Sequence, residues 1–462
     1  MRNKRNVKNG STLLIGIVLS VLTFWLFSNS LLNAAPKIQQ DFDSSGSTIN
    51  IAISITALFA GMFVVVAGNF SDKYGYVKMV YIGLALNIIG SLFVVIAPGV
   101  FILIIGRVIQ GLSAAVIMPS TLSLIKAFFD EEKRQMALSY WSIGSWGGAG
   151  VASFLGGLVS STVGWKWIFV ISIVLSILSM LLIKGTPEAK ASQYQHQKID
   201  FVGTVIFIVM IFSLNFVITQ SSQYGLLSFT ILGAFGTFVI AGLLFILVEV
   251  KKQHPLIDFK LLANKGYTGA TVSNFLMNAV AGTLIVGNSF AEEALGFNEF
   301  QSGALTITYL ITVIVTIRIG EKILQHLGAK KPMVIGSILN MCGILCISFV
   351  FLPPVAYVVS CVIGYFLYGL GLGFYATPSM DTALENAPDE EVGMASGIYK
   401  MSSSLGNAFG VALSGSLYAI GKSISDAYLG ATFGFYLNVG IALLTFILLQ
   451  LLIPKATQMK QN

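Results

Sequence analysis

The chain has 462 residues, of which 55% are hydrophobic and only 10% charged, and its mean hydropathy is +0.83. A soluble globular domain carries about 25% charged residues, so this composition excludes one and predicts an integral membrane protein. The formal net charge of +7 comes from lysines and arginines that flank apolar segments, and we expect no nucleic-acid partner from it.

Apolar blocks separated by short polar breaks predict membrane-spanning helices of about 20 residues, since barrel strands are about half as long. With the N-terminus inside, the outer loops hold only Lys37, Lys166 and Lys422, and nearly all other basic residues lie on the inner side. This asymmetry predicts that both termini are cytoplasmic. We expect fourteen spans, at residues 12–34, 48–70, 79–98, 101–125, 136–160, 167–184, 201–220, 227–249, 268–291, 301–319, 332–352, 355–377, 393–420 and 430–453.

The first predicted span carries a polar face among otherwise apolar residues. In lipid such groups would be left without hydrogen-bond partners, so we expect them to face an internal cavity. The four residues of this face are Thr23, Ser28, Asn29 and Asn33.

The segment "GNFSDKYGYVK", residues 68–78, ends the second span and opens an inner loop. Gly68 and Gly75 permit close packing and a tight turn. Asp72 is able to accept hydrogen bonds from the N-terminus of a nearby helix, where an anion is favoured. We interpret the segment as a conformational latch on the cytoplasmic side; the alternative is an ordinary loop carboxylate.

The segment "RVIQGLSAA", residues 107–115, places a cation inside the fourth span. An arginine at the centre of a membrane helix costs roughly 2.5–3.5 kcal/mol on insertion scales, so it must face protein or water. Arg107 and Gln110 lie on one helix face, and small residues beside them let a neighbour approach. Either Arg107 does chemistry and Gln110 lines a cavity, or Arg107 is a structural cation bonded to carbonyl groups.

The segment "GSWGGAGVASFLGG", residues 144–157, gives the fifth span a face of small residues. Such a face permits tight packing against a partner helix. We expect this seam to be formed by Gly148, Ser153, Gly156 and Gly157.

Residues 106–157 and 364–415 match each other at a nearly constant offset, including a "DEE" triplet at the same place between two spans. The repeat superposes the fourth and fifth spans on the twelfth and thirteenth, which predicts six helices, two extra helices and six more. Duplicated six-helix halves are the plan of major facilitator transporters. We therefore expect an N-terminal bundle at 1–184, a cytoplasmic linker at 185–200, two extra helices at 201–249, a second linker at 250–267, and a C-terminal bundle at 268–462.

Several stretches resemble signatures of this superfamily. Residues 68–78 resemble the loop pattern GxLaDrxGrk, although Tyr76 and Val77 stand where basic residues are preferred. Residues 107–115 resemble RxxQGxgaA. Residues 144–157 resemble the antiporter motif that ends in GPxxGG, with Ala152-Ser153 in place of Gly-Pro.

Together with "GWKWIF" (164–169) and "HPLIDFKLLANKGYTGAT" (254–271), almost the whole chain resembles the fourteen-helix drug:proton antiporters, and among them the staphylococcal Nor-type exporters. The resemblance implies proton-driven export of fluoroquinolones and amphiphilic cations across a plasma membrane. It implies a role for Arg107 in proton transfer, and a role in export for the small-residue seam of the fifth span. Many members carry an acid in the first helix, where this chain has Ser28.

Proton antiport requires a group that binds a proton or the substrate in turn, usually a buried carboxyl group. None of the twenty acids sits in the middle of a predicted span. We expect Glu292 or Glu293, at the outer end of the ninth span, to line an outward vestibule; alternatively they are a solvated loop pair. Asp381 follows the twelfth span beside Pro378, where we expect irregular chain near the cavity; alternatively it caps the thirteenth helix. Lys400, in the thirteenth span, either lines the pore or extends towards water.

The sequence therefore predicts a proton-coupled multidrug antiporter, most simply a monomer, whose partners are drugs, protons and lipid. It carries no phosphate-binding loop and no cysteine or histidine spacing typical of a metal site, so we expect no cofactor, no metal and no enzymatic activity. Three alternatives stay open: an uptake symporter for a small metabolite, a membrane-embedded flippase or enzyme, and a sensor that does not transport.

Overall fold

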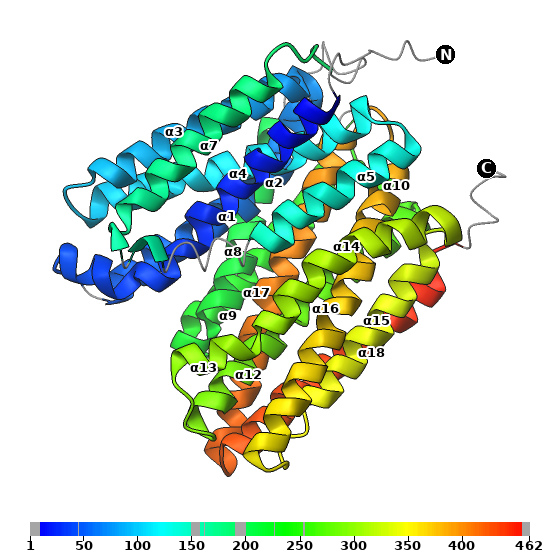
Figure 1. Ribbon diagram of the computed structural model, residues 1–462. Coiled ribbons are helices and arrows are strands. Elements are labelled where there is room, and N and C mark those ends of the chain that lie inside the picture. Colours follow the sequence, from blue (N-terminus) through cyan, green and yellow to red (C-terminus); the bar gives the residue numbers. More distant parts are fainter. Residues whose placement is uncertain are drawn as a thin grey trace. The chain divides into compact units, whose positions relative to one another are not determined.

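Over the residues that it describes, the computed structural model of the chain consists of helices joined by short connections (Figure 1). The described residues are 10–44, 46–148, 158–160, 162–189, 200–225, 227–252 and 255–454. Within helices, the side chains of 27–36, 46–47, 50, 131, 219, 221–223 and 299–300 are outside this description. Helices are expected here because an apolar chain in lipid must satisfy its own backbone hydrogen bonds.

The N-terminal half begins with four long helices. They are followed by a fifth segment that contains one π-helical turn, by α7, and by the two extra helices. The bounds are α1 (Gly10–Asp41), α2 (Gly46–Tyr74), α3 (Tyr76–Ile96), α4 (Val100–Phe128), α5 (Glu131–Ser142), the π-helical turn η1 (Ile143–Gly147), α7 (Lys166–Ile183), α8 (Phe201–Tyr224) and α9 (Phe229–Glu249).

The C-terminal half begins with a short helix, and two of its predicted spans are each built from two consecutive helices. The bounds are α10 (Phe259–Ala263), α11 (Lys265–Ala279), α12 (Gly282–Glu293), α13 (Glu299–Leu305), α14 (Ile307–Leu327), α15 (Lys330–Ile347), α16 (Pro354–Glu385), α17 (Val392–Ile424) and α18 (Ala427–Leu452).

Eleven segments among the described residues are long and apolar enough to cross a membrane. They confirm a multi-pass helical protein. The predicted spans 12–34, 136–160 and 393–420 fall on α1, on α5 with η1, and on α17, which do not meet this criterion over the described residues. The total of fourteen spans therefore stays a prediction.

The predicted span at 268–291 lies within the apolar segment Lys265–Glu293, in which a turn at Val280–Ala281 separates α11 from α12. One predicted detail of the C-terminal half is wrong. The expected break at Pro378 is absent, because α16 continues through this proline to Glu385. Asp381 therefore lies inside the helix, 1% exposed, and does not sit in irregular chain. Proline removes one hydrogen bond, but the packed neighbours of a membrane helix tolerate that loss.

The chain forms two compact units by the proximity of its Cα atoms. One comprises residues 1–208, 248–258 and 387–401, and the other comprises 209–247, 259–386 and 402–462. The first ten residues of α17 thus group with the N-terminal helices. The five predicted domains and linkers are continuous stretches of sequence, whereas these units are grouped by proximity in space. The predicted division therefore stays a prediction.

In the first unit, α4 packs against α2 and α3, while α7 packs against α1 and α3. A buried cluster that includes Trp165, Phe169 and Leu103 fills one end of this unit. The indole of Trp165 donates to the Asp41 carboxylate at 2.7 Å, which ties the start of α7 to the end of α1. Residues 164–169 are therefore an anchor within the protein.

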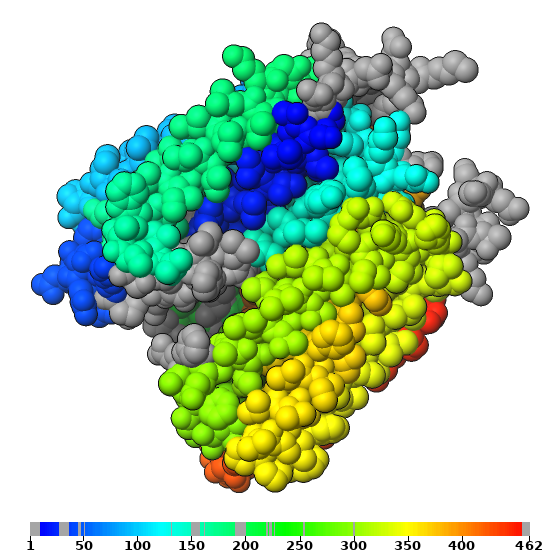
Figure 2. Space-filling view, viewed as in Figure 1, coloured from blue at the N-terminus to red at the C-terminus, as the bar shows by residue number. Residues whose placement is uncertain are grey.

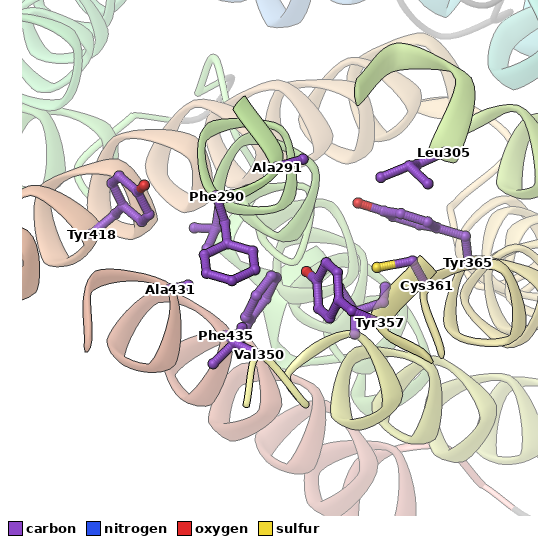
Figure 3. Packing of buried hydrophobic residues seen from close by; sticks show 12 residues of the cluster. Phe290, Ala291, Leu305, Val350, Tyr357, Cys361, Tyr365, Tyr418, Ala431 and Phe435 are labelled. Carbon is purple, nitrogen blue, oxygen red and sulfur yellow. The ribbon is translucent and has the colours of Figure 1, made fainter. Parts of the chain in front are cut away.

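In the second unit, α16 packs against α14 and α15, and α18 packs against α11, α12 and α15. Its core is aromatic, as Figure 3 shows around Phe290, Tyr357 and Tyr365. The rings of Phe290 and Tyr357 meet edge to face with centroids 5.1 Å apart, a favoured geometry for aromatic pairs. This cluster joins α12, α16 and α18.

Within each unit the same glycines permit the same close approach, as the repeat predicts. A Cβ atom at Gly90 of α3 would lie 2.9 Å from the carbonyl oxygen of Gly106, and one at Gly343 of α15 would lie 2.6 Å from that of Gly364. Gly106 and Gly364 are matched positions of the repeat. The repeat therefore specifies backbone contact between two helices and not only composition.

The outward face of α14 carries an apolar stripe at helical spacing. Its residues are Ile307, Ile311, Val315 and Ile319, each more than two-fifths exposed. α14 lies at the visible surface in Figure 2. A soluble protein rarely exposes such a stripe, which is typical of a helix in a multi-pass membrane protein.

We predict that Gly90→Val and Gly343→Val will each lower the thermal stability of the purified protein, because the new side chain overlaps backbone of the neighbouring helix. Overpacking of this kind costs about 1–3 kcal/mol. The control is Gly233→Val in α9, where nothing lies within 4 Å of the added Cβ. Melting in detergent measures the effect, and equal melting temperatures for all three variants would contradict it.

Candidate functional site

The carboxylate of Asp72, near the end of α2, is bonded to the first turn of α17. It is 2% exposed, and it accepts the backbone N–H groups of Gly393 at 2.7 Å and Met394 at 2.9 Å. These are donors that a helix cannot satisfy within its own first turn, and the positive end of the helix dipole favours an anion there. Asp72 is thus an N-terminal cap supplied to α17 from another helix.

Glycines bring α2 and α17 into backbone contact beside this cap. A Cβ atom at Gly68 would lie 2.2 Å from the carbonyl oxygen of Gly393, and one at Gly397 would lie 2.7 Å from that of Val64. Any larger side chain would hold the two helices apart. Gly75 has φ 112°, a conformation that L side chains rarely adopt, and it turns the chain between α2 and α3.

A lysine that the sequence analysis did not identify also reaches the region around Asp72 and the start of α17. Lys126, in the last turn of α4, donates to the carbonyl oxygen of Ala387 at 2.6 Å and lies 3.6 Å from Asp389. Both partners belong to the segment that leads into α17. In the sequence, Lys126 stands shortly before the "DEE" triplet at 130–132. Nothing in the sequence indicates that it pairs with the other triplet, at 389–391.

Arg107 is completely buried and bonded to backbone of α2. Its Nε donates to the carbonyl oxygen of Ala52 at 3.0 Å, and its guanidinium also donates to Ile53 and to the side chain of Gln110 at 2.9 Å. The hydroxyl of Thr56 returns a bond to the carbonyl oxygen of Arg107 at 3.0 Å. The planar fork of arginine suits several acceptors at once. The structure therefore gives this residue a clear structural role.

The polar chain continues from Gln110 across two more helices. Gln110 donates to the Ser91 hydroxyl at 2.9 Å, and Ser91 donates to the side chain of Asn87 at 3.3 Å. Asn87 then donates to Ser172 and Ser176 of α7 at 3.0 Å and 2.7 Å. This network satisfies buried polar groups, which would otherwise destabilise the bundle. It links α2, α4, α3 and α7 in one connected path.

Lys400 lies over an aromatic ring. Its Nζ is 5.0 Å from the ring centroid of Trp141 in α5, within the usual range of a cation–π interaction. The indole of Trp141 donates to the Thr121 hydroxyl of α4 at 3.0 Å. Lys400 is partly exposed and Trp141 is completely buried, so the ammonium group lies between the buried ring and the surface.

The predicted polar face of the first span is only partly testable. Thr23 is completely buried, and its hydroxyl donates to the carbonyl oxygen of Ser20 at 2.7 Å. Gln110 is also completely buried and bonded on both ends. Protein groups therefore satisfy both side chains, and their expected place on a cavity stays a prediction. The side chains of Ser28, Asn29 and Asn33 lie outside the described residues.

The small-residue seam of the fifth span is described as far as Gly148, and its partner is α1. A Cβ atom at Gly144 would lie 3.2 Å from Val18, and one at Gly148 would lie 3.0 Å from the ring of Trp25. The remaining predicted members, Ser153, Gly156 and Gly157, lie outside the described residues.

The two adjacent acids at the end of α12 have different partners. Glu293 accepts the hydroxyl of Tyr418 at 2.9 Å and pairs with Lys422 at 2.7 Å. Glu292 accepts the hydroxyl of Ser302 at 2.6 Å. These contacts hold Glu293 as an anion paired across two helices.

A compact ionic cluster joins the start of α8 to the end of α9. Asp200 caps α8 by accepting the Gly203 N–H at 2.8 Å, and it also accepts a hydrogen bond from Lys252. Glu249, 1% exposed, accepts from Lys252 at 2.8 Å and from the Leu256 N–H. One ammonium group thus bridges two carboxylates and fixes the chain that leaves α9.

The ionisation of this cluster follows from its contacts. Burial acts to raise the pKa of Asp200, but its hydrogen bonds to Glu249, Lys252 and Gly203 outweigh burial and hold the pKa below its ordinary value. Burial acts to lower the pKa of Lys252, but its bonds to Asp200 and Glu249 outweigh burial and raise it. Both groups are therefore charged near neutral pH.

The described residues contain no group of three or more histidine, cysteine, aspartate or glutamate side chains placed to hold a metal ion. The described site instead offers hydrogen bonds and ion pairs, which hold helices together.

The family model of the Major Facilitator Superfamily matches residues 13–254 and 267–461. The chain is 54% identical, over 97% of each chain, to a quinolone resistance protein NorB of Staphylococcus aureus strain Newman. It is 52% identical, over 98% of each chain, to the protein of the same name from strain MRSA252.

Solved structures of low identity share the fold. The human organic anion transporter MFSD10 is 14% identical with a TM-score of 0.66, covering 95% of this chain and 98% of its own. The proton:xylose symporter XylE is 13% identical with a TM-score of 0.66, covering 96% of each chain. At such identities the likeness supports the fold alone.

We predict that Lys252→Met will lower the thermal stability of the protein at pH 7 by about 1–2 kcal/mol, because it removes charge-assisted bonds to two carboxylates. The contribution of Asp200 is present above its unfolded pKa of about 3.9 and is lost as pH falls through its lowered folded pKa. The contribution of Lys252 is complete below its unfolded pKa of about 10.4 and is lost as pH rises through its raised folded pKa.

The difference in melting temperature between the parent and Lys252→Met should therefore shrink below about pH 4, where Asp200 becomes protonated. Lys251→Met, at the exposed neighbouring lysine, is the matched control. A difference that does not shrink in acid, or one that the control reproduces, would count against the cluster.

Proposed function

Because the chain belongs to the major facilitator superfamily, we propose that it exports fluoroquinolones and amphiphilic, often cationic drugs in exchange for protons by alternating access. It is a multi-pass membrane transporter of the plasma membrane and not an enzyme. The observation that carries the proposal is the 54% identity over 97% of the chain with a quinolone resistance protein.

The arrangement around Asp72 supports a latch. Alternating access needs contacts that form in one state and break in the other. The bonds from Gly393 and Met394 to Asp72 join α2 to α17, and the glycines beside them let the two helices meet backbone to backbone. In the proposal, Gly68, Asp72 and Gly75 hold this junction closed until the cytoplasmic side opens.

Proton coupling is assigned to Arg107 together with one carboxyl group. Arg107 holds its charge among backbone carbonyls of α2, so movement of α2 changes its surroundings. Of the three candidate carboxyl groups, Asp381 fits best, because it is 1% exposed inside α16, whereas Glu292 and Glu293 are exposed. A buried ionisable group in a membrane helix is expected to be functional.

The finer topology is also part of the proposal. It has fourteen spans, both termini in the cytoplasm, and a monomer as the working unit in the lipid bilayer. The small-residue seam of the fifth span packs on α1 at Gly144 and Gly148. In the proposal, this close contact limits leakage of solutes between the two helices. Lys400 contributes to the drug pathway from its place over Trp141.

The test uses purified protein in sealed liposomes with a defined pH gradient, followed by norfloxacin or ethidium movement. We expect movement towards the more acidic side that an uncoupler abolishes, and we expect Arg107→Ala to abolish it too. A melting curve for the variant separates lost coupling from lost folding. Movement in the same direction as the protons would make the protein a symporter, and no gradient-dependent movement would overturn the proposal.

We predict that Asp72→Asn will reduce gradient-driven transport, because each carboxylate oxygen accepts one N–H group of α17, whereas an amide is neutral and has only one acceptor oxygen. Hydrogen bonds to a charged group contribute about 1.5–3 kcal/mol, so the latched state should lose roughly tenfold or more of its population. Glu132→Gln, at an exposed acid in the first turn of α5, is the matched control. Transport by Asp72→Asn at the parent rate would exclude the latch.

A further inference from the structure

The start of α3 has no cap of its own. Gly75 precedes it and offers no side chain, so the first N–H groups of the helix need acceptors from elsewhere. Glu188, which lies in the predicted polar linker after α7, supplies them. Its carboxylate accepts the N–H of Val77 at 3.0 Å and that of Lys78 at 2.9 Å.

The same linker also satisfies the remaining donor of that turn. The backbone N–H of Tyr76 donates to the carbonyl oxygen of Ala189 at 2.9 Å. The Ala189 N–H donates to the Glu188 carboxylate at 3.0 Å, which orients it. Glu188 and Ala189 thus bind all three N–H groups with which α3 begins.

Gly75 is shaped to admit this carboxylate. A Cβ atom at this position would lie 2.5 Å from Cδ of Glu188 and 2.6 Å from its Oε1. The absence of a side chain therefore serves the docking of Glu188 as well as the positive φ of the turn. Packing of α7 on α3 delivers the linker to this point, and the Tyr81 hydroxyl donates to the carbonyl oxygen of Met180 at 2.8 Å between them.

Tyr76 connects this cap to the latch. Its backbone is held by Ala189, while its hydroxyl donates to Asp72 at 3.1 Å. Asp72 in turn accepts the N–H groups of α17. In the family pattern basic residues follow the second glycine, whereas this chain has Tyr76 and Val77 there, and both are bound by the 188–189 segment.

We propose that Glu188 is a positioning residue for the cytoplasmic latch: by capping α3 it sets Tyr76, and through Tyr76 it holds Asp72 in place to cap α17. Residues 188–189, at the start of the linker that follows α7, are then part of the latch. The inference rests on the proposed latch function of Asp72, and it extends that function to a residue in a distant segment.

The test measures opening of the latch without any drug. Ser396, 1% exposed in the second turn of α17, is replaced by cysteine in full-length protein whose three native cysteines are alanine. Labelling by a membrane-impermeant maleimide in liposomes then reports how often this helix face is exposed. We expect Asp72→Asn to raise the labelling rate about tenfold and Glu188→Ala to raise it several-fold. Glu188→Gln should fall between Glu188→Ala and the parent, because its amide oxygen still accepts one N–H group.

The decisive comparison is the double variant. If Glu188 acts through Asp72, then Glu188→Ala adds nothing to the labelling rate of Asp72→Asn. A residue that only stabilises α3 would instead add its full effect. Tyr76→Phe should remove most of the Glu188 effect in the same way, and Glu132→Ala, at an exposed acid, should label like the parent.

Each outcome has a separate meaning. Labelling of Glu188→Ala at the parent rate, or full additivity with Asp72→Asn, overturns the inference while leaving the latch. An Asp72→Asn variant that labels like the parent overturns the latch and the inference together. If the parent carries no drug but the labelling pattern holds, the inference stands and the assignment of drugs falls.

Discussion

The structure depends on carboxylates that cap helices to which they do not belong. A helix leaves its first N–H groups without partners, and near a membrane water does not reliably supply them. Asp72 caps α17, and Glu188 with Ala189 caps α3. Such bonds are strong while they are dry, and they are easily replaced once water enters. They therefore suit junctions that must be firm in one state and absent in another.

The two halves are alike in packing but not in chemistry. The glycines that bring α3 to α4 have counterparts that bring α15 to α16. At the positions matched to Arg107 and Gln110, however, the second half has Tyr365 and Tyr368, both buried. Arg107 and Gln110 thus belong to a polar network through α2, α3, α4 and α7, while Tyr365, at the position matched to Arg107, belongs to an aromatic core. The two copies of the repeat thus share their backbone packing and differ in the side chains at these matched positions.

Sequence reasoning failed where packing overrides local preference. Pro378 reads as a breaker, yet α16 continues through it, because neighbours hold the helix on both sides of one missing bond. The turn at Val280–Ala281 is marked only by the glycine that follows it, Gly282, and it lies where a Cβ at Gly410 of α17 would be 1.7 Å from the carbonyl oxygen of Ala279. Glu188 stood in a stretch with no periodicity, and its partners lie more than a hundred residues earlier.

The sequence alone determined the membrane class, the helical fold, the internal repeat, and the acceptor role of Asp72 at a helix N-terminus. These follow from composition, from the period of apolar residues and from short motifs, which are local properties of the chain. Only the tertiary structure decided which helix Asp72 caps, that Arg107 binds carbonyl groups of α2, and that Glu188 completes α3. Each of these is a bond between distant segments, and its partner is chosen by how helices pack, a property that no single segment encodes.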